Sequence, residues 1–217
     1  MRRKGLLFDL DGVLVDTARY HFKAWKRLAE TFEVDFNEER NEKLKGVSRV
    51  ESLRKILEWG GKTLSDAEFQ KAMDLKNTWY LEYIDRMAPD EVLPGAERFL
   101  KEARQDGYKI ALGSASKNAP RILEKVGLTP LFDAIIDGNR TSRSKPDPEV
   151  FLLGAEDLLL QPSQCVVFED AEAGVEAAKA GGMYAVGVGS AEVLHKADKV
   201  IPGFEDLHLV DLEKHWS

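Results

Sequence analysis

The chain has 217 residues, 43% hydrophobic and 32% charged, a composition typical of soluble globular proteins. Its net charge of −7 argues against nucleic acid or an anionic membrane as a partner, so any phosphate site must be a local cluster of cations. The single cysteine, Cys165, excludes an internal disulfide, and the sequence has neither a signal-peptide pattern nor a membrane-spanning stretch, so a cytoplasmic protein is expected.

The first apolar stretch of the chain ends in two aspartates. Residues 6–8 predict a short buried strand, and Asp9 and Asp11 follow it. Because side chains two apart on an extended chain point the same way, we expect these carboxylates to project together at the end of the strand. In open parallel sheets, ligands bind at that edge, so the pair is a candidate site. The structural alternative is an ordinary Asp-Gly turn formed by Asp11 and Gly12.

Helical periodicity replaces the strand pattern next. Regularly spaced apolar residues from Phe22 to Phe32 predict a first helix, which Asp16 or Thr17 can cap. Three more helices are predicted, over residues 37–45, 48–59 and 65–86. With no convincing strand between them, residues 16–88 read as an all-helical insertion.

Strands and helices alternate from Pro89 onward. Strands are predicted over residues 108–113, 134–136, 165–168, 184–188 and 199–201. Helices are predicted over residues 95–105, 120–127, 149–159 and 173–180. The alternation indicates an α/β fold with a doubly wound parallel sheet. We therefore predict a core of residues 1–15 and 89–217, with residues 16–88 as a helical cap over the strand ends.

Polar side chains follow several of these segments. Ser114 ends a strand, where its hydroxyl and nearby N–H groups can bind phosphate, although turn serines show the same pattern. Lys145 precedes a proline-stiffened loop, where its ammonium is either held in place or solvated. Glu169 and Asp170 end a buried strand, where charge is costly unless it is paired or bound to metal. The structural alternative is that Asp170 caps the next helix.

The order of these groups resembles the four motifs of the haloacid dehalogenase superfamily over nearly the whole chain. The motifs are Phe8-Asp9-Leu10-Asp11-Gly12-Val13, Ser114, Lys145 and Glu169-Asp170. By this resemblance, Asp9 attacks phosphorus and Asp11 is the general acid and base. Ser114 and Lys145 then hold the transferring phosphoryl group and offset its charge.

The resemblance also implies a Mg²⁺ cofactor. Asp9, the backbone carbonyl of Asp11 and Asp170 are the implied ligands, with Glu169 at or beside the ion. Carboxylates together with water and phosphate oxygens are the ligands that Mg²⁺ prefers.

The helical insertion carries further candidates. His21 lies one turn after Thr17 and shares its helical face, although a lone histidine is more often structural. The turn Lys45-Gly46-Val47-Ser48-Arg49 carries two cations at the start of a helix, where backbone N–H groups favour anions. It is either a solvated turn or, with Ser116-Lys117-Asn118, a second phosphate site.

Within the superfamily, the chain resembles the β-phosphoglucomutase family. The added matching stretches are Asp16-Thr17, Tyr20-His21-Phe22, Ala24-Trp25, Leu44-Lys45-Gly46-Val47-Ser48-Arg49, Lys76-Asn77 and Ser114-Ala115-Ser116-Lys117-Asn118. That family interconverts β-D-glucose 1-phosphate and β-D-glucose 6-phosphate through β-glucose 1,6-bisphosphate and an aspartyl phosphate. The implied partners are therefore a sugar phosphate and glucose 1,6-bisphosphate, and a monomer is expected.

The same resemblance implies roles for the cap residues. His21 supports Asp11, and Thr17 gates proton transfer. Residues from the matching stretches bind substrate, namely Trp25, Lys45, Gly46, Val47, Ser48, Arg49, Lys76, Ala115, Ser116, Lys117 and Asn118. Among these, Lys45, Gly46 and Lys76 serve sugar discrimination or closure, and Arg49, Ser116 and Asn118 hold the distal phosphate.

Two other functions remain open from the sequence. A cap-bearing, Mg²⁺-dependent sugar-phosphate phosphatase of the same superfamily shares the core motifs. The turn ending at Arg49, with His21 and Lys76, favours the mutase instead. A catalytically idle sugar-phosphate sensor is expected to lose Asp9 or Asp11, and this chain has both.

Overall fold

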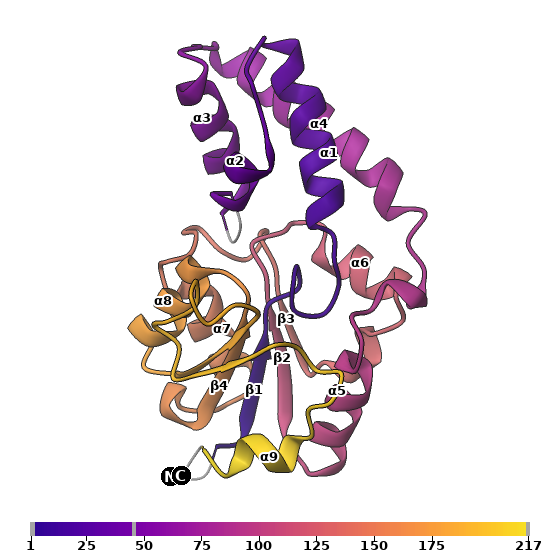
Figure 1. Ribbon diagram of the computed structural model, residues 1–217, viewed down its shortest axis with the longest axis vertical. Helices are drawn as coiled ribbons and strands as arrows, with labels where there is room; N and C mark the ends of the chain where they lie inside the picture. Colours follow the sequence, from indigo (N-terminus) through magenta and orange to yellow (C-terminus); the bar gives the residue numbers. More distant parts are fainter. Residues whose placement is uncertain (1–2, 45–46, 216–217) are drawn as a thin grey trace.

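The computed structural model describes residues 3–44 and 47–215 and contains a parallel sheet in the order β3-β2-β1-β4-β5-β6 (Figure 1). The strands are β1 (Gly5–Phe8), β2 (Lys109–Gly113), β3 (Ala134–Ile136), β4 (Cys165–Glu169), β5 (Tyr184–Val188) and β6 (Lys199–Ile201). β1 pairs with β2 on one side and with β4 on the other. The doubly wound α/β fold predicted from the sequence is confirmed.

Helices occupy two regions of the molecule. Those beyond the carboxyl ends of the strands, at the top of Figure 1, are α1 (Ala18–Thr31), α2 (Glu38–Glu42), α3 (Arg49–Trp59) and α4 (Asp66–Ile84). Those around the sheet are α5 (Ala96–Gln105), α6 (Ala119–Lys125), α7 (Glu149–Asp157), α8 (Glu172–Ala180) and α9 (Leu209–Glu213). Short 3₁₀ turns lie at Pro89–Glu91, Thr129–Leu131 and Pro162–Gln164. Each predicted helix is present, whereas α9 was missed because it is short and has no side-chain capping bond.

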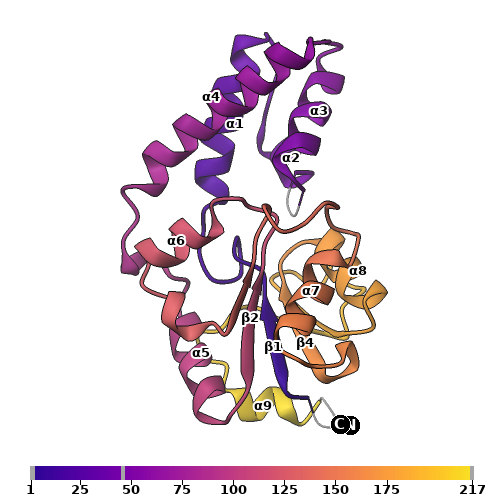
Figure 2. The ribbon, with the colours of Figure 1, turned by 180° about the vertical axis from the view of Figure 1, so that it is seen from behind.

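The sheet is buried on both faces. Figures 1 and 2 show α5 and α6 on one side and α7 and α8 on the other. Along β1, Leu6 and Phe8 pack toward the first pair, and Leu7 toward the second. The Phe8 ring stacks on Phe168 with a centroid distance of 4.6 Å. This two-sided burial holds the central strand, which carries the catalytic candidates, in one position.

The helices beyond the sheet have a core of their own. Side chains such as Trp25, Leu28 and Ile56 form a separate buried cluster, and α4 packs against both α1 and α3. Ser65 and Glu68 form the reciprocal capping box at the start of α4. Thr17 is the N-cap residue of α1, but its side chain makes no capping bond, so the prediction of a side-chain cap there is wrong. None of the helices in the described ranges is long and apolar enough to cross a membrane.

Two linkers join the α1–α4 group to the sheet, and they are tied to each other. Val15 of the first linker pairs antiparallel with Val92 of the second. Glu91 accepts hydrogen bonds from Arg19 Nη2 and from the Tyr20 hydroxyl, each at 2.7 Å. The two crossings therefore form one joint, not two independent tethers.

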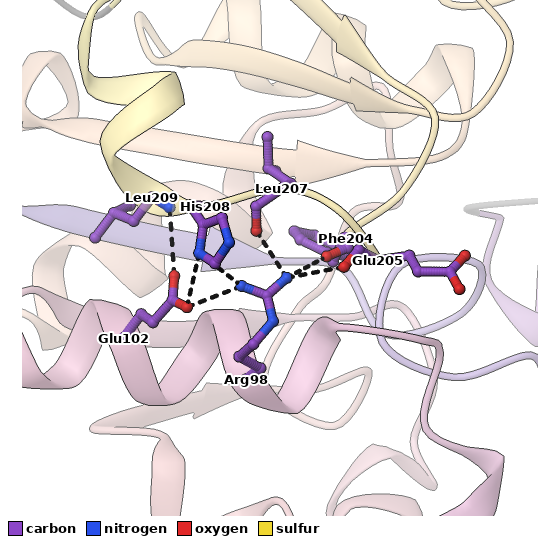
Figure 3. Close-up of polar contacts among 7 residues, drawn as sticks. All are labelled: Arg98, Glu102, Phe204, Glu205, Leu207, His208 and Leu209. Atoms are coloured by element: carbon purple, nitrogen blue, oxygen red, sulfur yellow. Dashed lines mark hydrogen bonds and ion pairs between the residues drawn. The ribbon is translucent and has the colours of Figure 1, made fainter.

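Arg98 on α5 fastens the C-terminal segment to the sheet domain (Figure 3). Its Nη2 donates to three backbone carbonyls, those of Phe204 (2.8 Å), Glu205 (3.0 Å) and Leu207 (2.9 Å). Its Nη1 pairs with Glu102 at 2.8 Å, and the same carboxylate lies 3.1 Å from His208 Nδ1. The Phe204 ring in turn packs against Phe8 at a centroid distance of 6.2 Å. Arg98 thereby holds the segment that supports the central strand.

Replacing Arg98 by alanine should lower the free energy of unfolding by about 1–3 kcal/mol, because the charged donor leaves several carbonyls without their partner. Urea denaturation followed by circular dichroism measures the change. Lys101→Ala on the same helix is the matched control, because its exposed pair with Glu97 contributes little. Equal stabilities for the two variants would contradict this role of Arg98.

Candidate active site

The predicted catalytic residues meet at the carboxyl edge of the three central strands. Asp9 follows β1, Ser114 follows β2, and Glu169 ends β4. Asp9 N–H donates to the carbonyl of Phe168 at 2.9 Å, which continues the pairing of β1 with β4 into the catalytic loop. All three side chains are buried. The strand order alone brings together residues that lie far apart in the sequence.

Lys145 lies at the centre of this edge. Its Nζ donates to Asp9 Oδ1 at 2.5 Å, to Glu169 Oε2 at 2.9 Å and to the carbonyl of Gly113 at 3.1 Å. Burial disfavours the ammonium, but the carboxylates of Asp9 and Glu169 outweigh it and raise the pKa of Lys145 above its ordinary value. Lys145 is therefore a permanent positive charge beside the nucleophile candidate.

Three carboxylates can hold a metal ion together. Ligand oxygens of Asp9, Glu169 and Asp170 lie within 4.8 Å of one another. Glu169 Oε1 is buried and has no hydrogen-bond partner in the described part of the chain. Burial raises the pKa of Glu169 well above its ordinary value although the Lys145 ammonium opposes the rise, so a divalent cation would stabilise the ionised cluster. The three carboxylates, and the Glu169 oxygen that has no hydrogen bond, thus fit a hard divalent cation.

The helix-cap alternative for Asp170 is excluded. Helix α8 begins at Glu172, and Ala171 is its N-cap residue. Asp170 instead lies in the turn before the helix, next to Gly12 of the first catalytic loop, where a Cβ would come 2.2 Å from Asp170 Oδ2. Gly12 also has a φ of 78°, a left-handed conformation that favours glycine. This glycine lets the two loops approach closely.

Gly174 plays a similar part behind Glu169. A Cβ on Gly174 would lie 2.0 Å from Glu169 Cδ, so the carboxylate packs directly against the backbone of α8. Neither Gly12 nor Gly174 was singled out for this contact from the sequence, since only the folded loops create it.

Asp11 lies in a protonation-favouring environment. Burial, then the negative charges of Asp9 and Asp170, raise the pKa of Asp11 well above its ordinary value. Asp11 can therefore carry a proton at neutral pH while Asp9 is held beside the Lys145 ammonium. Two neighbouring carboxyl groups with opposed environments are typical of an acid and nucleophile pair.

His21, which is half-buried, and Lys76, which is buried, form a pair between α1 and α4. Lys76 Nζ lies 2.9 Å from His21 Nδ1, and it also lies over the rings of Trp25 (4.6 Å) and Tyr80 (4.5 Å). Burial and neighbouring cations lower the pKa of both residues well below their ordinary values. Because one nitrogen of such a contact must accept, these shifts fit a pair that carries no more than one positive charge.

A cavity of about 780 Å³ connects this edge of the sheet with the helices above it. The predicted site residues on its wall are Asp9, Asp11, His21, Trp25, Val47, Ser48, Arg49, Lys76, Ser114, Ala115, Ser116, Lys117, Asn118, Lys145 and Asp170. Thr17 and Glu169 are buried behind the wall. Lys45 and Gly46 lie outside the described residues.

A second group of cationic and polar side chains, predicted to bind a phosphate, lies on the same wall. Arg49 comes from the first turn of α3, and the stretch Ser116-Lys117-Asn118 from the loop after β2. Ser114 Oγ accepts from the N–H of Ser116 at 3.1 Å, and this bond shapes the loop. Asn118 Nδ2 also donates to Asn77 Oδ1 of α4 at 2.9 Å, a direct bond between the sheet domain and the helices.

Several cavity residues were not singled out as site candidates from the sequence. Ser52 and Lys55 on α3 are examples, and Ser52 is almost fully buried. Ser52 lies three positions after Arg49, and Lys55 three positions after Ser52, so all three share one face of the helix. That shared face was the signal in the sequence that could have identified them. Arg143 lines the cavity from the loop before Lys145 and pairs with Asp147 at 2.9 Å.

This arrangement of two aspartates, a serine, a buried lysine and an acidic pair defines a phosphotransfer site of the haloacid dehalogenase type. The chain belongs to the haloacid dehalogenase-like hydrolase family, whose model matches residues 3–182. It is 44% identical to the β-phosphoglucomutase of Bacillus subtilis, across 99% of this chain and 96% of that protein. The family predicted from the motifs is thus confirmed.

Two further comparisons bear on the site. The solved structure of a β-phosphoglucomutase from Clostridium difficile matches with a TM-score of 0.96 at 39% identity, covering 99% of this chain and 97% of that one. A phosphorylated carbohydrates phosphatase of Thermotoga maritima is 32% identical, over 83% of this chain and 82% of that protein. Relatives therefore include both a mutase and a phosphatase.

Replacing Gly174 by alanine should weaken binding of a divalent cation about tenfold or more, because the added methyl group displaces the Glu169 carboxylate. Isothermal titration calorimetry with Mg²⁺ measures the affinity. Gly203→Ala is the control, since a Cβ there meets nothing within 4 Å among the described residues. Unchanged affinity in a folded Gly174→Ala protein would show that the position of Glu169 does not govern the cation.

Proposed function

We propose that the protein is a β-phosphoglucomutase that interconverts β-D-glucose 1-phosphate and β-D-glucose 6-phosphate. In this proposal the phosphoryl group passes through an aspartyl phosphate on Asp9 and through β-glucose 1,6-bisphosphate. The 44% identity to the mutase of Bacillus subtilis over nearly the full length of both chains supports this activity.

The single observation that carries the proposal is one cavity lined by two sets of cationic and polar side chains. Lys145 and Ser114 lie beside Asp9, at the reacting end, whereas Arg49 on α3 and Ser116-Lys117-Asn118 after β2 supply the second set. A bisphosphate has two phosphates, and a mutase must hold one while the other reacts. A phosphatase needs only the first set, because water is its acceptor.

The side chains at the reacting end support a double displacement. The Asp9 carboxylate attacks phosphorus, an O–P bond to Asp9 forms, and the O–P bond to the sugar oxygen breaks. Asp11 gives its proton to that leaving oxygen, which its raised pKa favours. In the second displacement, Asp11 takes the proton of the sugar hydroxyl that attacks the phosphoryl group on Asp9. Lys145 and the Ser114 loop offset the charge spread over the phosphoryl oxygens.

We propose Mg²⁺ as the cofactor, held by Asp9, Asp170 and the backbone carbonyl of Asp11, with Glu169 at or beside it. When bound, the ion supplies positive charge that brings the anionic nucleophile and the phosphoryl group together. The cluster of carboxylate oxygens from Asp9, Glu169 and Asp170 supports this assignment.

We further propose that residues 16–88 move as a cap on the core formed by residues 1–15 and 89–217. The joint formed by Val15 and Val92 supports a hinge, and the bond between Asn77 and Asn118 supports direct contact across the cavity. Closure excludes water, which would otherwise hydrolyse the aspartyl phosphate.

The second candidate function is a sugar-phosphate phosphatase, as the Thermotoga maritima relative is named. The core residues are compatible with either reaction. The second set of side chains, Arg49 with Ser116-Lys117-Asn118, favours the mutase. The pair of His21 and Lys76 favours it as well.

The protein, incubated with Mg²⁺, β-glucose 1-phosphate and catalytic glucose 1,6-bisphosphate, should produce glucose 6-phosphate. Phosphorus NMR measures the product. Asp9→Asn should abolish conversion while preserving the fold, because an amide of nearly the same shape is a poor nucleophile. Accumulation of inorganic phosphate in place of glucose 6-phosphate would favour the phosphatase.

Replacing Arg49 by alanine should weaken binding of the bisphosphate by about 2–4 kcal/mol, because the guanidinium fork grips the phosphate that is not reacting. Isomerisation should slow, while phosphorylation of Asp9 by acetyl phosphate, which has no distal phosphate, should change little. Arg40→Ala is the control, since Arg40 lies on α2 and is not part of the cavity wall. Wild-type mutase kinetics in Arg49→Ala would refute the distal site.

A further inference from the structure

Besides Glu169 Oε1, three buried oxygen atoms near the reacting end make no well-formed hydrogen bond among the described residues. They are Asp11 Oδ1, Thr17 Oγ1 and the hydroxyl oxygen of Tyr80. The Thr17 and Tyr80 side chains are fully buried. Buried hydroxyl groups in folded proteins nearly always have a partner, so three such atoms in one region indicate an interaction that another arrangement of the site completes.

The three groups come from different segments but lie close together. Burial raises the pKa of Tyr80 well above its ordinary value, and the charge of Asp11 adds to the rise. Hydrogen bonding to the Thr17 hydroxyl opposes it, so the two hydroxyl groups lie within reach of each other. Thr17 lies in the first linker and Tyr80 on α4, which packs along α1. The Thr17 hydroxyl is also not used to cap α1, so its one proton is available.

Tyr80 is firmly placed although it is not on the cavity wall. Its ring lies 4.2 Å from that of His21, and the Lys76 ammonium lies 4.5 Å from its centroid. The ring therefore packs against both His21 and Lys76. Its hydroxyl has no evident part in that packing, since ring contacts do not require it.

We propose that Tyr80 is a positioning residue for the general acid: its hydroxyl donates to Thr17 Oγ1, and the Thr17 hydroxyl donates to Asp11 Oδ1. Each group then has a partner, and the donors and acceptors of the chain match. Oδ1 is fixed, which leaves Oδ2 of Asp11 to exchange the proton with the sugar oxygen. Tyr80 neither touches substrate nor transfers a proton. This role rests on the mutase chemistry proposed above.

Tyr80→Phe tests the hydroxyl alone, because the ring and its contacts with His21 and Lys76 remain. The mutase kcat should fall about 10- to 100-fold with KM changed less than twofold, since a misoriented acid loses part of the rate gain of proton transfer. Phosphorylation of Asp9 by acetyl phosphate should stay within twofold of wild type, because acetate leaves without a proton. The melting temperature should fall by no more than about 2–4 °C, since the ring packing is retained and the variant removes one hydrogen bond.

Tyr83→Phe is the matched control, because Tyr83 lies on the same helix and stacks on Tyr20, away from Asp11. Its kinetics should match wild type in both reactions. A loss in Tyr80→Phe that is equal with both phosphoryl donors, or no loss with either, would overturn the proposal.

Thr17→Val provides a second test, because it removes the middle of the chain of hydrogen bonds. The double variant with Tyr80→Phe should be no slower than Thr17→Val alone, whereas multiplied losses would refute a shared path. If the wild-type protein hydrolyses phosphate esters without isomerising them, the mutase proposal fails separately. The role of Tyr80 is then tested by comparing hydrolysis of alkyl and aryl phosphates. Tyr80→Phe should slow only the alkyl esters, because only their alkoxide leaving groups need the acid.

Discussion

The buried ammonium of Lys145 is the interaction on which the site depends. It bonds at once to Asp9, Glu169 and the carbonyl of Gly113, and so joins the ends of all three central strands. Without that charge, the carboxylates at this edge would repel one another in a place that water does not reach. With it, the three carboxylates can lie close enough together to hold a divalent cation. A stabilising contact of the fold is therefore also an electrostatic component of the site.

The helices above the sheet supply what the edge itself lacks. Arg49 and the pair of His21 and Lys76 face the aspartates across one cavity, and both linkers meet at the pairing of Val15 with Val92. In the proposed closure, this single joint would let the whole helical group move without disturbing the strand that bears Asp9. The Arg98 contacts at the far end of the sheet support that strand from the opposite direction.

The fold class and the residues at the strand ends could be predicted from the sequence because local patterns encode both. A short apolar run followed by Asp9 and Asp11, or by Glu169 and Asp170, identifies a strand and its polar end within ten residues. The placement of Tyr80 behind His21 could not be predicted, because it depends on how α4 packs along α1. The contact of Gly174 with Glu169 was equally hidden, since it depends on the closeness of a helix backbone to one carboxylate. The Thr17 cap failed because the backbone of Thr17 is already helical, with φ of −94° and ψ of −1°, whereas a side-chain cap needs an extended residue there.

The central position of β1 has a consequence for how the chain is made. Gly5 pairs with Lys109 on one side and with Cys165 on the other, so the first strand to leave the ribosome has no partner until much later. The helices α1–α4, whose contacts with one another are closer in sequence, are complete before then. The strand that precedes Asp9 thus remains apolar and unpaired while residues 9–108 are synthesised. Such long-range pairing slows folding and leaves the edges of that strand exposed to aggregation until β2 and β4 are made.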